Sequence, residues 1–188
     1  MSRAAPIAAA AVALLVTGCV AVAWIEGAPI VPADAGRAGG GQLGVVFLAL
    51  LAAAFAVYLG ALRLARRRPP ALRAVLAAAV AIQLVPLAGP LLLSTDAWTY
   101  WEYGRIAAVH GGNPYVDTPS EFATDPAYEY AGAAWRETTS VYGPAFTLLS
   151  EPVALVSGSS AAAAAWIFKT LAALGVLACV LLAARLAR

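Results

Sequence analysis

Charged residues are scarce in this chain, and several chemically useful side chains are almost missing. Only 12% of its 188 residues are charged, against about a quarter in soluble domains. The chain has one histidine, and its two cysteines, Cys19 and Cys179, both lie within apolar runs. These scarcities exclude a disulfide framework and a thiolate metal site. We expect two inert thiols, no metal ligands and no cofactor, with a divalent cation left open.

Apolar residues are what the chain has in excess. They make up 62% of the sequence, and the mean hydropathy is +0.80, whereas soluble domains are about half apolar. A net charge of +2 gives no indication of a nucleic-acid partner. The expected fold class is all-α: a polytopic transmembrane helical protein with an extracytoplasmic loop that contains short juxtamembrane helices. The expected partner of its spans is the lipid bilayer.

Four apolar stretches reach the length of about 20 residues that a membrane-crossing helix needs. They are residues 4–25, 43–62, 74–93 and 161–184, the last interrupted by Lys169. Pro86 and Pro90 are expected to kink the third stretch, and residues 26–42 read as a glycine- and proline-rich connector. A fifth apolar segment, 144–157, has fourteen residues and is interrupted by Glu151. Its length favours a re-entrant or interfacial helix over a span.

Arginine placement predicts the orientation in the membrane. Five arginines lie in residues 63–73, between the second and third spans. Basic residues between spans mark the cytoplasmic side. We therefore expect a multi-pass protein of the cell membrane with a cytoplasmic N-terminus and an extracytoplasmic loop. The expected organisation is three transmembrane helices in 1–93, the loop in 94–143, and a short apolar helix plus a final transmembrane helix in 144–188.

The long loop holds most of the polar and aromatic side chains. Residues 94–144 contain six of the seven tyrosines, three of the five tryptophans, and seven acids against two arginines, a balance of 2 − 7 = −5. A helix is predicted from Asp96, after the capping residues Ser94 and Thr95, to a stop at Gly111. Such a helix would lie along the membrane surface, with Glu102 and Arg105 as a possible exposed pair.

Two further short helices are predicted in the loop. Thr118 and Glu121 form a capping box with Pro119 at the first helical position. Asp125 and Pro126 predict the start of another helix, running toward Trp135. Because both prolines interrupt a helix, one continuous helix is excluded.

The spacing of short motifs in this loop resembles the first large extracytoplasmic loop of polytopic glycosyltransferases of the GT-C type. It is most similar to the bacterial polyprenol-phosphate-mannose-dependent mannosyltransferases. The resemblance covers 91–167, and its residues are Asp96, Tyr100, Tyr103-Gly104-Arg105, Gly112-Asn113-Pro114-Tyr115, Trp135 and Tyr142-Gly143-Pro144. Two features depart from the pattern. Asp96-Ala97-Trp98 lacks the second acid of a DxD pair, and the family has more spans, so only its N-terminal part is matched.

The resemblance implies a membrane glycosyltransferase, or the N-terminal part of one, that moves a hexose, expected to be mannose. The donor would be a polyprenyl-phosphate sugar and the acceptor an extracytoplasmic glycan or glycolipid. Asp96 at the membrane edge is the expected catalytic base, and cationic side chains would bind the phosphate. The expected substrate-binding residues are Tyr100, Tyr103, Arg105, His110, Asn113, Tyr115, Trp135, Arg136 and Tyr142.

Other interpretations remain open on the sequence. Asp96 could serve only as a helix cap, and the aromatic residues could form only an interface belt. A small transporter or channel subunit would use Lys169 and Glu151 to line a polar path. A non-catalytic membrane partner built on the same fold is a third possibility. The concentration of polar residues in the loop rather than in the spans favours the enzyme.

Overall fold

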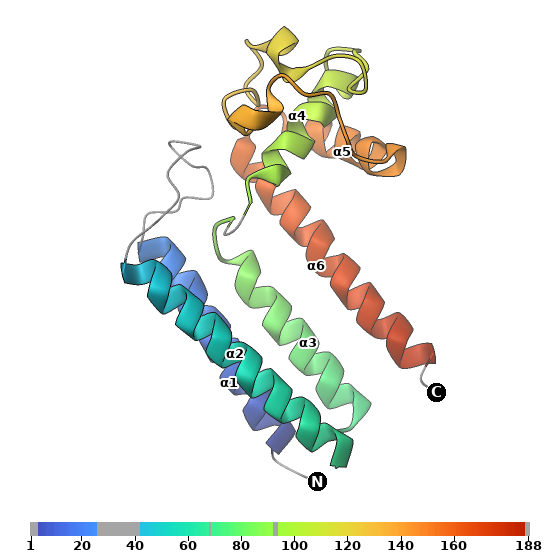
Figure 1. The fold of residues 1–188 in the computed structure, drawn as a ribbon. Helices are drawn as coiled ribbons and strands as arrows, with labels where there is room; N and C mark the ends of the chain where they lie inside the picture. Colours follow the sequence, from blue (N-terminus) through green and yellow to red (C-terminus); the bar gives the residue numbers. More distant parts are fainter. Residues whose placement is uncertain (1–3, 26–41, 68, 92–93, 187–188) are drawn as a thin grey trace. The chain divides into compact units, whose positions relative to one another are not determined.

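The computed structural model describes residues 4–25, 42–67, 69–91 and 94–186, which form helices and turns with no β-strand among them. Three of these helices are long and apolar enough to cross a membrane: α1 (Ala4–Ile25), α2 (Gln42–Arg67) and α6 (Ala161–Leu186) (Figure 1). The expected all-helical fold class is therefore confirmed. The connector predicted over 26–42 lies almost entirely outside the described residues.

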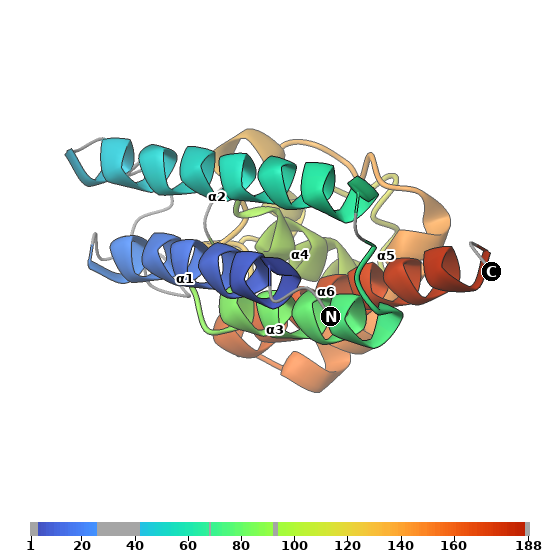
Figure 2. The same ribbon diagram turned by 90° about the horizontal axis from the view of Figure 1, so that it is seen from below.

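The chain divides into two compact units. Within the first, α1 lies between α2 and α3 (Leu72–Leu87) (Figure 2). Small residues allow the close contacts: a Cβ atom on Gly18 would lie 3.1 Å from Leu50 Cδ1. The indole Nε1 of Trp24 donates a hydrogen bond of 3.1 Å to the carbonyl of Ala88. This bond ties the end of α1 to the turn that follows α3.

The third predicted span is shorter than expected. Residues 74–93 were expected to form one kinked helix, but α3 ends at Leu87, after 16 residues. At 1.5 Å per residue it is about 24 Å long. A typical span crosses a hydrocarbon core of about 30 Å, which takes roughly 20 residues. Pro86 lies in its last turn, and Pro90 has no N–H with which to continue the helix. The two prolines end the helix rather than kink it.

The second unit, Leu91–Lys169, is built around α4 (Asp96–Ala108). Nine of the thirteen residues of α4 are buried: Ala97, Trp98, Thr99, Trp101, Glu102, Tyr103, Gly104, Arg105 and Ile106. The side chains of α4 are therefore enclosed by the unit rather than exposed, while its placement along the membrane surface stays a prediction. Aromatic residues on several sides of α4, which suggested contact with the membrane interface, pack instead against the rest of the unit. Trp98 illustrates this, because it is 1% exposed and its Nε1 donates to the carbonyl of Ala161.

Helix α5 (Pro144–Ser157) has the predicted bounds and packs closely on α4. Gly104 makes this approach possible, since a Cβ atom at that position would overlap the backbone carbonyl of Ser150. Gly158, with φ +56°, ends α5 in a backbone conformation that favours glycine. Only three residues separate Ser157 from the start of α6 at Ala161, and the first turns of α6 belong to the same unit.

The loop between α4 and α5 follows the sequence signals in part. The stop after α4 is confirmed: the N–H of Gly112 bonds the carbonyl of Ile106, and Gly111 has φ +68°. The capping box is also confirmed, in the 3₁₀ helix η1 (Pro119–Phe122). The helix predicted from Asp125 is wrong. Residues 126–130 form hydrogen-bonded turns, and the only helical turn there is η2 (Ala133–Trp135).

Candidate functional site

Asp96 is the first residue of α4. Its backbone N–H donates to the Ser94 hydroxyl at 3.0 Å, and its side chain is half-buried. The residue in the cap position is Thr95, whose side chain makes no capping bond. A carboxylate in the first turn is stabilised by the N–H groups and the positive end of the helix dipole. The backbone thus holds an acid at the exposed start of the unit's central helix.

Two tyrosine hydroxyls accompany the Asp96 carboxylate. The rings of Tyr100 and Tyr142 meet edge to face, with centroids 4.7 Å apart. Burial raises the pKa of both hydroxyls, and the negative charge of Asp96 raises them further. Both phenols therefore stay protonated and can donate hydrogen bonds. Phe146 and Phe168 complete the aromatic packing around Tyr100, at 4.8 and 5.7 Å between centroids.

The segment around η2 borders this group. A Cβ atom on Gly132 would lie 3.7 Å from the Thr95 hydroxyl oxygen and 3.2 Å from Trp135 Cδ1. The Trp135 ring lies 6.4 Å from that of Tyr142. The next residue, Arg136, places its guanidinium 4.7 Å from the Tyr128 ring centroid and donates to the carbonyl of Glu129. We name Asp96, Tyr100, Trp135 and Tyr142 the Asp96 group.

Arg105 and His110 form a second group with Asp125. Arg105 Nε and His110 Nε2 each lie 2.6 Å from one oxygen of the Asp125 carboxylate. Arg105 also donates to the carbonyl of Gly158. Burial raises the pKa of Asp125, but the bonds from Arg105, the Ala127 N–H and His110 outweigh it and hold that pKa below its ordinary value. The ionised Asp125 thus links the loop to α4 through Arg105, and Arg105 in turn bonds the α5–α6 turn at Gly158.

Glu102 does not form the exposed pair with Arg105 that its spacing suggested. It is fully buried, and neither of its carboxylate oxygens has a hydrogen-bond partner among the described residues. Burial, and then the charge of Asp125, raise its pKa to about 8, against the opposing effect of Arg105. Glu102 is therefore a protonated acid at neutral pH. The exposed-pair prediction failed because the loop folds back over this side of α4.

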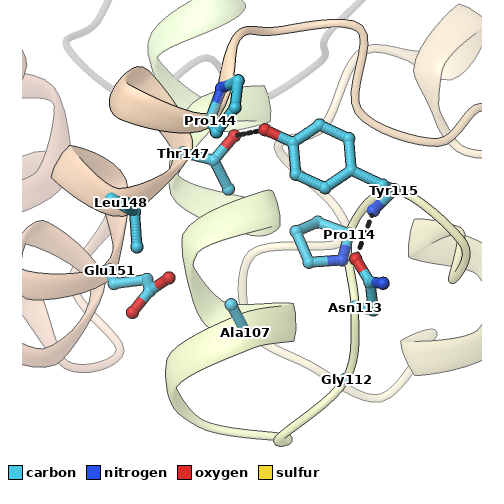
Figure 3. Close-up of a pocket in the computed structure, with 9 residues that line it drawn as sticks. All are labelled: Ala107, Gly112, Asn113, Pro114, Tyr115, Pro144, Thr147, Leu148 and Glu151. Carbon is cyan, nitrogen blue, oxygen red and sulfur yellow. Dashed lines mark hydrogen bonds between the residues drawn. The ribbon is translucent and has the colours of Figure 1, made fainter.

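A pocket of about 310 Å³ lies at the other end of α4 (Figure 3). Its walls come from three elements: the end of α4 at Ala107, the 112–115 turn, and α5. Tyr115 donates through its hydroxyl to the carbonyl of Tyr142 at 2.9 Å, and that hydroxyl also bonds the Thr147 hydroxyl at 2.8 Å. Glu151 extends from α5 toward Ala107. The side-chain oxygen of Asn113 accepts the Tyr115 N–H.

The structure thus sorts the predicted residues into three places. Asp96, Tyr100, Trp135 and Tyr142 lie together, with Arg136 next to them in the chain. Arg105 and His110 share Asp125, and Arg105 is nine residues from Asp96, about half a helical turn out of phase and so on the opposite side of α4. Asn113 and Tyr115 line the pocket. Tyr103 is 1% exposed and donates to the carbonyl of Thr138, so it holds the loop against α4.

Sequence reasoning missed Asp125, Thr147 and Glu151 as contributors to these places. Asp125 follows no recognisable spacing, because its partner Arg105 lies 20 residues earlier in the chain. The Asp125-Pro126 pair, which predicted the start of a helix, begins a turn instead, in which the Ala127 N–H donates to the Asp125 carboxylate. Among the described residues, no three His, Cys, Asp or Glu side chains lie close enough together to hold a metal ion.

The fold and the site define a class of membrane protein: apolar helices long enough to cross a membrane carry a polar unit, in which an acid lies among aromatic rings at the start of a buried helix. The comparison with family models identifies the family: residues 5–188 match the alpha-(1->6)-mannopyranosyltransferase N-terminal domain. The chain belongs to this family, and the predicted resemblance to the N-terminal part of a mannosyltransferase is confirmed. No curated protein and no solved structure matches the chain.

Proposed function

We propose that this chain carries the acceptor-activating part of a mannosyltransferase that uses a polyprenyl-phosphate mannose donor and an extracytoplasmic glycan or glycolipid acceptor. Asp96 is the proposed base, and Tyr100, Trp135 and Tyr142 bind the sugars. Family membership supports mannosyl transfer. The donor, the acceptor and the side of the membrane are our proposals, from the spans, the charge pattern and the site.

The single observation that carries this proposal is the position of Asp96. Its carboxylate is half-buried in a group of aromatic rings, and Tyr100 of that group contacts Phe168, two turns into α6. Since α6 is long and apolar enough to span a membrane, the start of α4 lies beside the first turns of a membrane helix. A lipid-linked sugar presents its reactive carbon at this depth.

The proposed reaction is one displacement at the anomeric carbon. The acceptor hydroxyl oxygen bonds to that carbon while the bond from carbon to phosphate oxygen breaks, through an oxocarbenium-like centre. Asp96 takes the hydroxyl proton, and the polyprenyl phosphate leaves with the electron pair. The hydroxyls of Tyr100 and Tyr142, kept protonated by their raised pKa values, donate hydrogen bonds to substrate oxygens. Flat rings with polar edges suit the pyranose faces.

The phosphate needs a cation, and the structure favours one of the two loop arginines. Arg105 is committed to Asp125 and Gly158 and faces away from Asp96. Arg136 follows Trp135 directly and forms no ion pair with an acid among the described residues. We therefore assign phosphate contact to Arg136 and a positioning role to Arg105 and His110. Arginine suits this contact because its fork of N–H donors matches phosphate oxygens.

The test is transfer of labelled mannose from polyprenyl-phosphate mannose to an α-1,6-linked manno-oligosaccharide, in membranes that contain the whole protein. Asp96→Asn removes the charge while keeping the shape, so we expect a loss of about 10²–10⁴-fold in turnover with unchanged membrane insertion. The matched control is Glu129→Gln, an exposed loop acid, which should transfer normally. Near-normal transfer by Asp96→Asn would remove Asp96 from the mechanism.

A further inference from the structure

The pocket at the C-terminal end of α4 is separate from the Asp96 group but lies on the same side of the helix. Asp96 and Ala107 are eleven residues apart, which is close to three full turns. The two positions therefore share a face and are separated by about 16 Å along the axis. They are also connected, because Tyr115 of the pocket donates to the backbone carbonyl of Tyr142 in the Asp96 group.

The walls of the pocket combine flat apolar surfaces with a few polar atoms. Tyr115, Pro114 and Pro144 supply the apolar surfaces, and Glu151 and Asn113 supply polar groups (Figure 3). A pyranose ring has the same division, with C–H groups on its faces and hydroxyls at its edge. Mostly apolar pockets with a few placed polar groups, and volumes from about 300 Å³, are typical of small-ligand sites.

Hydrogen bonds hold the pocket in shape before any ligand arrives. The Tyr115 hydroxyl is fixed at both the Tyr142 carbonyl and Thr147. The Asn113 N–H donates to the Asp117 carboxylate at 2.6 Å, which fixes the turn beneath the ring. Gly112 lets this turn close, because a Cβ atom there would lie 2.7 Å from the same carboxylate. A site already ordered loses less entropy when it binds.

The charge around the pocket selects against anions. Glu151 is the acidic residue in its wall, and the Asp117 carboxylate lies behind Gly112. No arginine or lysine lines it among the described residues. A phosphate or other anionic group would meet two carboxylates without a compensating cation. A neutral sugar instead can donate its hydroxyls to the Glu151 oxygens, as charge-assisted hydrogen bonds.

We propose that this pocket, formed by the 112–115 turn and the first two turns of α5, is a subsite for one neutral sugar residue of the acceptor glycan. In the acceptor chain, this bound sugar lies a few sugars away from the sugar that reacts at Asp96. The inference rests on the proposed function, because it names where the acceptor chain continues. It makes the enzyme sensitive to acceptor length: a single sugar reaches only Asp96, whereas an oligosaccharide reaches both places.

The test measures binding without requiring transfer. Whole protein in lipid nanodiscs, free of sugar-headed detergents, is titrated with α-1,6-linked mannotriose, and binding is read by saturation-transfer NMR and calorimetry. We expect a Kd near the millimolar range, and about 5-fold weaker binding by Glu151→Gln, because a charge-assisted hydrogen bond becomes a neutral one. Asp96→Asn should retain at least part of the binding. Mannose 6-phosphate, the anionic probe, should bind more weakly than mannose.

A second variant tests the subsite by the KM for acceptors of different length. Thr147→Val removes one of the two hydrogen bonds that fix the Tyr115 hydroxyl. It should raise the KM for a long acceptor several-fold, and by a larger factor than the KM for a single-sugar acceptor. Equal binding by the wild type and Glu151→Gln, or preference for the phosphorylated sugar, would overturn the subsite. Mannotriose binding at this pocket in a protein without transfer activity would contradict the proposed function but leave the subsite standing.

Discussion

Glu102 shows how the protonation of one residue affects the stability of this fold. Its pKa is raised from 4.5 to about 8, so the folded state holds a proton that the unfolded chain releases. The folded state is therefore favoured by Glu102 at low pH. That stabilisation is lost progressively as the pH rises from roughly 4.5 to 8. Among the described residues no salt bridge stabilises the ionised form of Glu102, because Arg105 is paired with Asp125.

Glu102→Gln is the corresponding prediction. Glutamine keeps the size and stays neutral, so the melting temperature of the purified protein should depend less on pH between 5 and 8.5. At pH 8 we expect the variant to melt at least about 3 °C above the wild type. The exposed acid Glu129 provides the control, since Glu129→Gln should keep the wild-type slope. Parallel curves for the wild type and Glu102→Gln would show that Glu102 is ionised in the folded protein.

At the scale of elements, the contact of α4 with α5 depends on one missing side chain. Gly104→Ala brings a methyl group into the backbone of Ser150, and overpacking of this kind costs about 1–3 kcal/mol. The matched control is Gly175→Ala in α6, where the added methyl group meets no atom within 4 Å. That change should be neutral or stabilising by up to about 1 kcal/mol. Thermal unfolding in micelles measures both, and equal melting temperatures would contradict the close contact.

Features of the elements that depend on neighbouring residues could be predicted from the sequence. The bounds of α1 and α5, the glycine stop after α4 and the capping box at Thr118 all follow from local chemistry. The burial of α4 could not be predicted, because its cover comes from α5 and from residues 20 or more positions away. The same distance hid the contact of Asp125 with Arg105. Aromatic residues around a helix suit a membrane interface and a protein interior equally well.

At the scale of the whole molecule, orientation in the membrane stays a prediction from charge. Single cysteines at Val116 and at Arg67, two exposed positions, test it in a background without Cys19 and Cys179. An impermeant thiol reagent applied to intact cells should label position 116 and not 67, because basic loops stay cytoplasmic. After the membrane is opened, both should react. The opposite pattern in intact cells would place the Asp96 group on the cytoplasmic side.

The domain division into 1–93, 94–143 and 144–188 likewise remains a prediction. The compact units of the structure divide the chain differently, with α5 and the first turns of α6 joined to the loop in Leu91–Lys169. The reason is packing: α5 covers α4, and Trp98 and Arg105 bond the carbonyls of Ala161 and Gly158. The functional loop therefore includes the helix that follows it.

The interior position of α4 has a consequence for how relatives of this protein can diverge. A helix enclosed by its own loop keeps its sequence under packing constraints, whereas outward-facing positions such as Val116, Glu129 and Val141 carry no such constraint. Substitutions can accumulate there without unfolding the unit. Acceptor preference can then change over evolution through the outer turns, while the helix that presents the carboxylate stays the same.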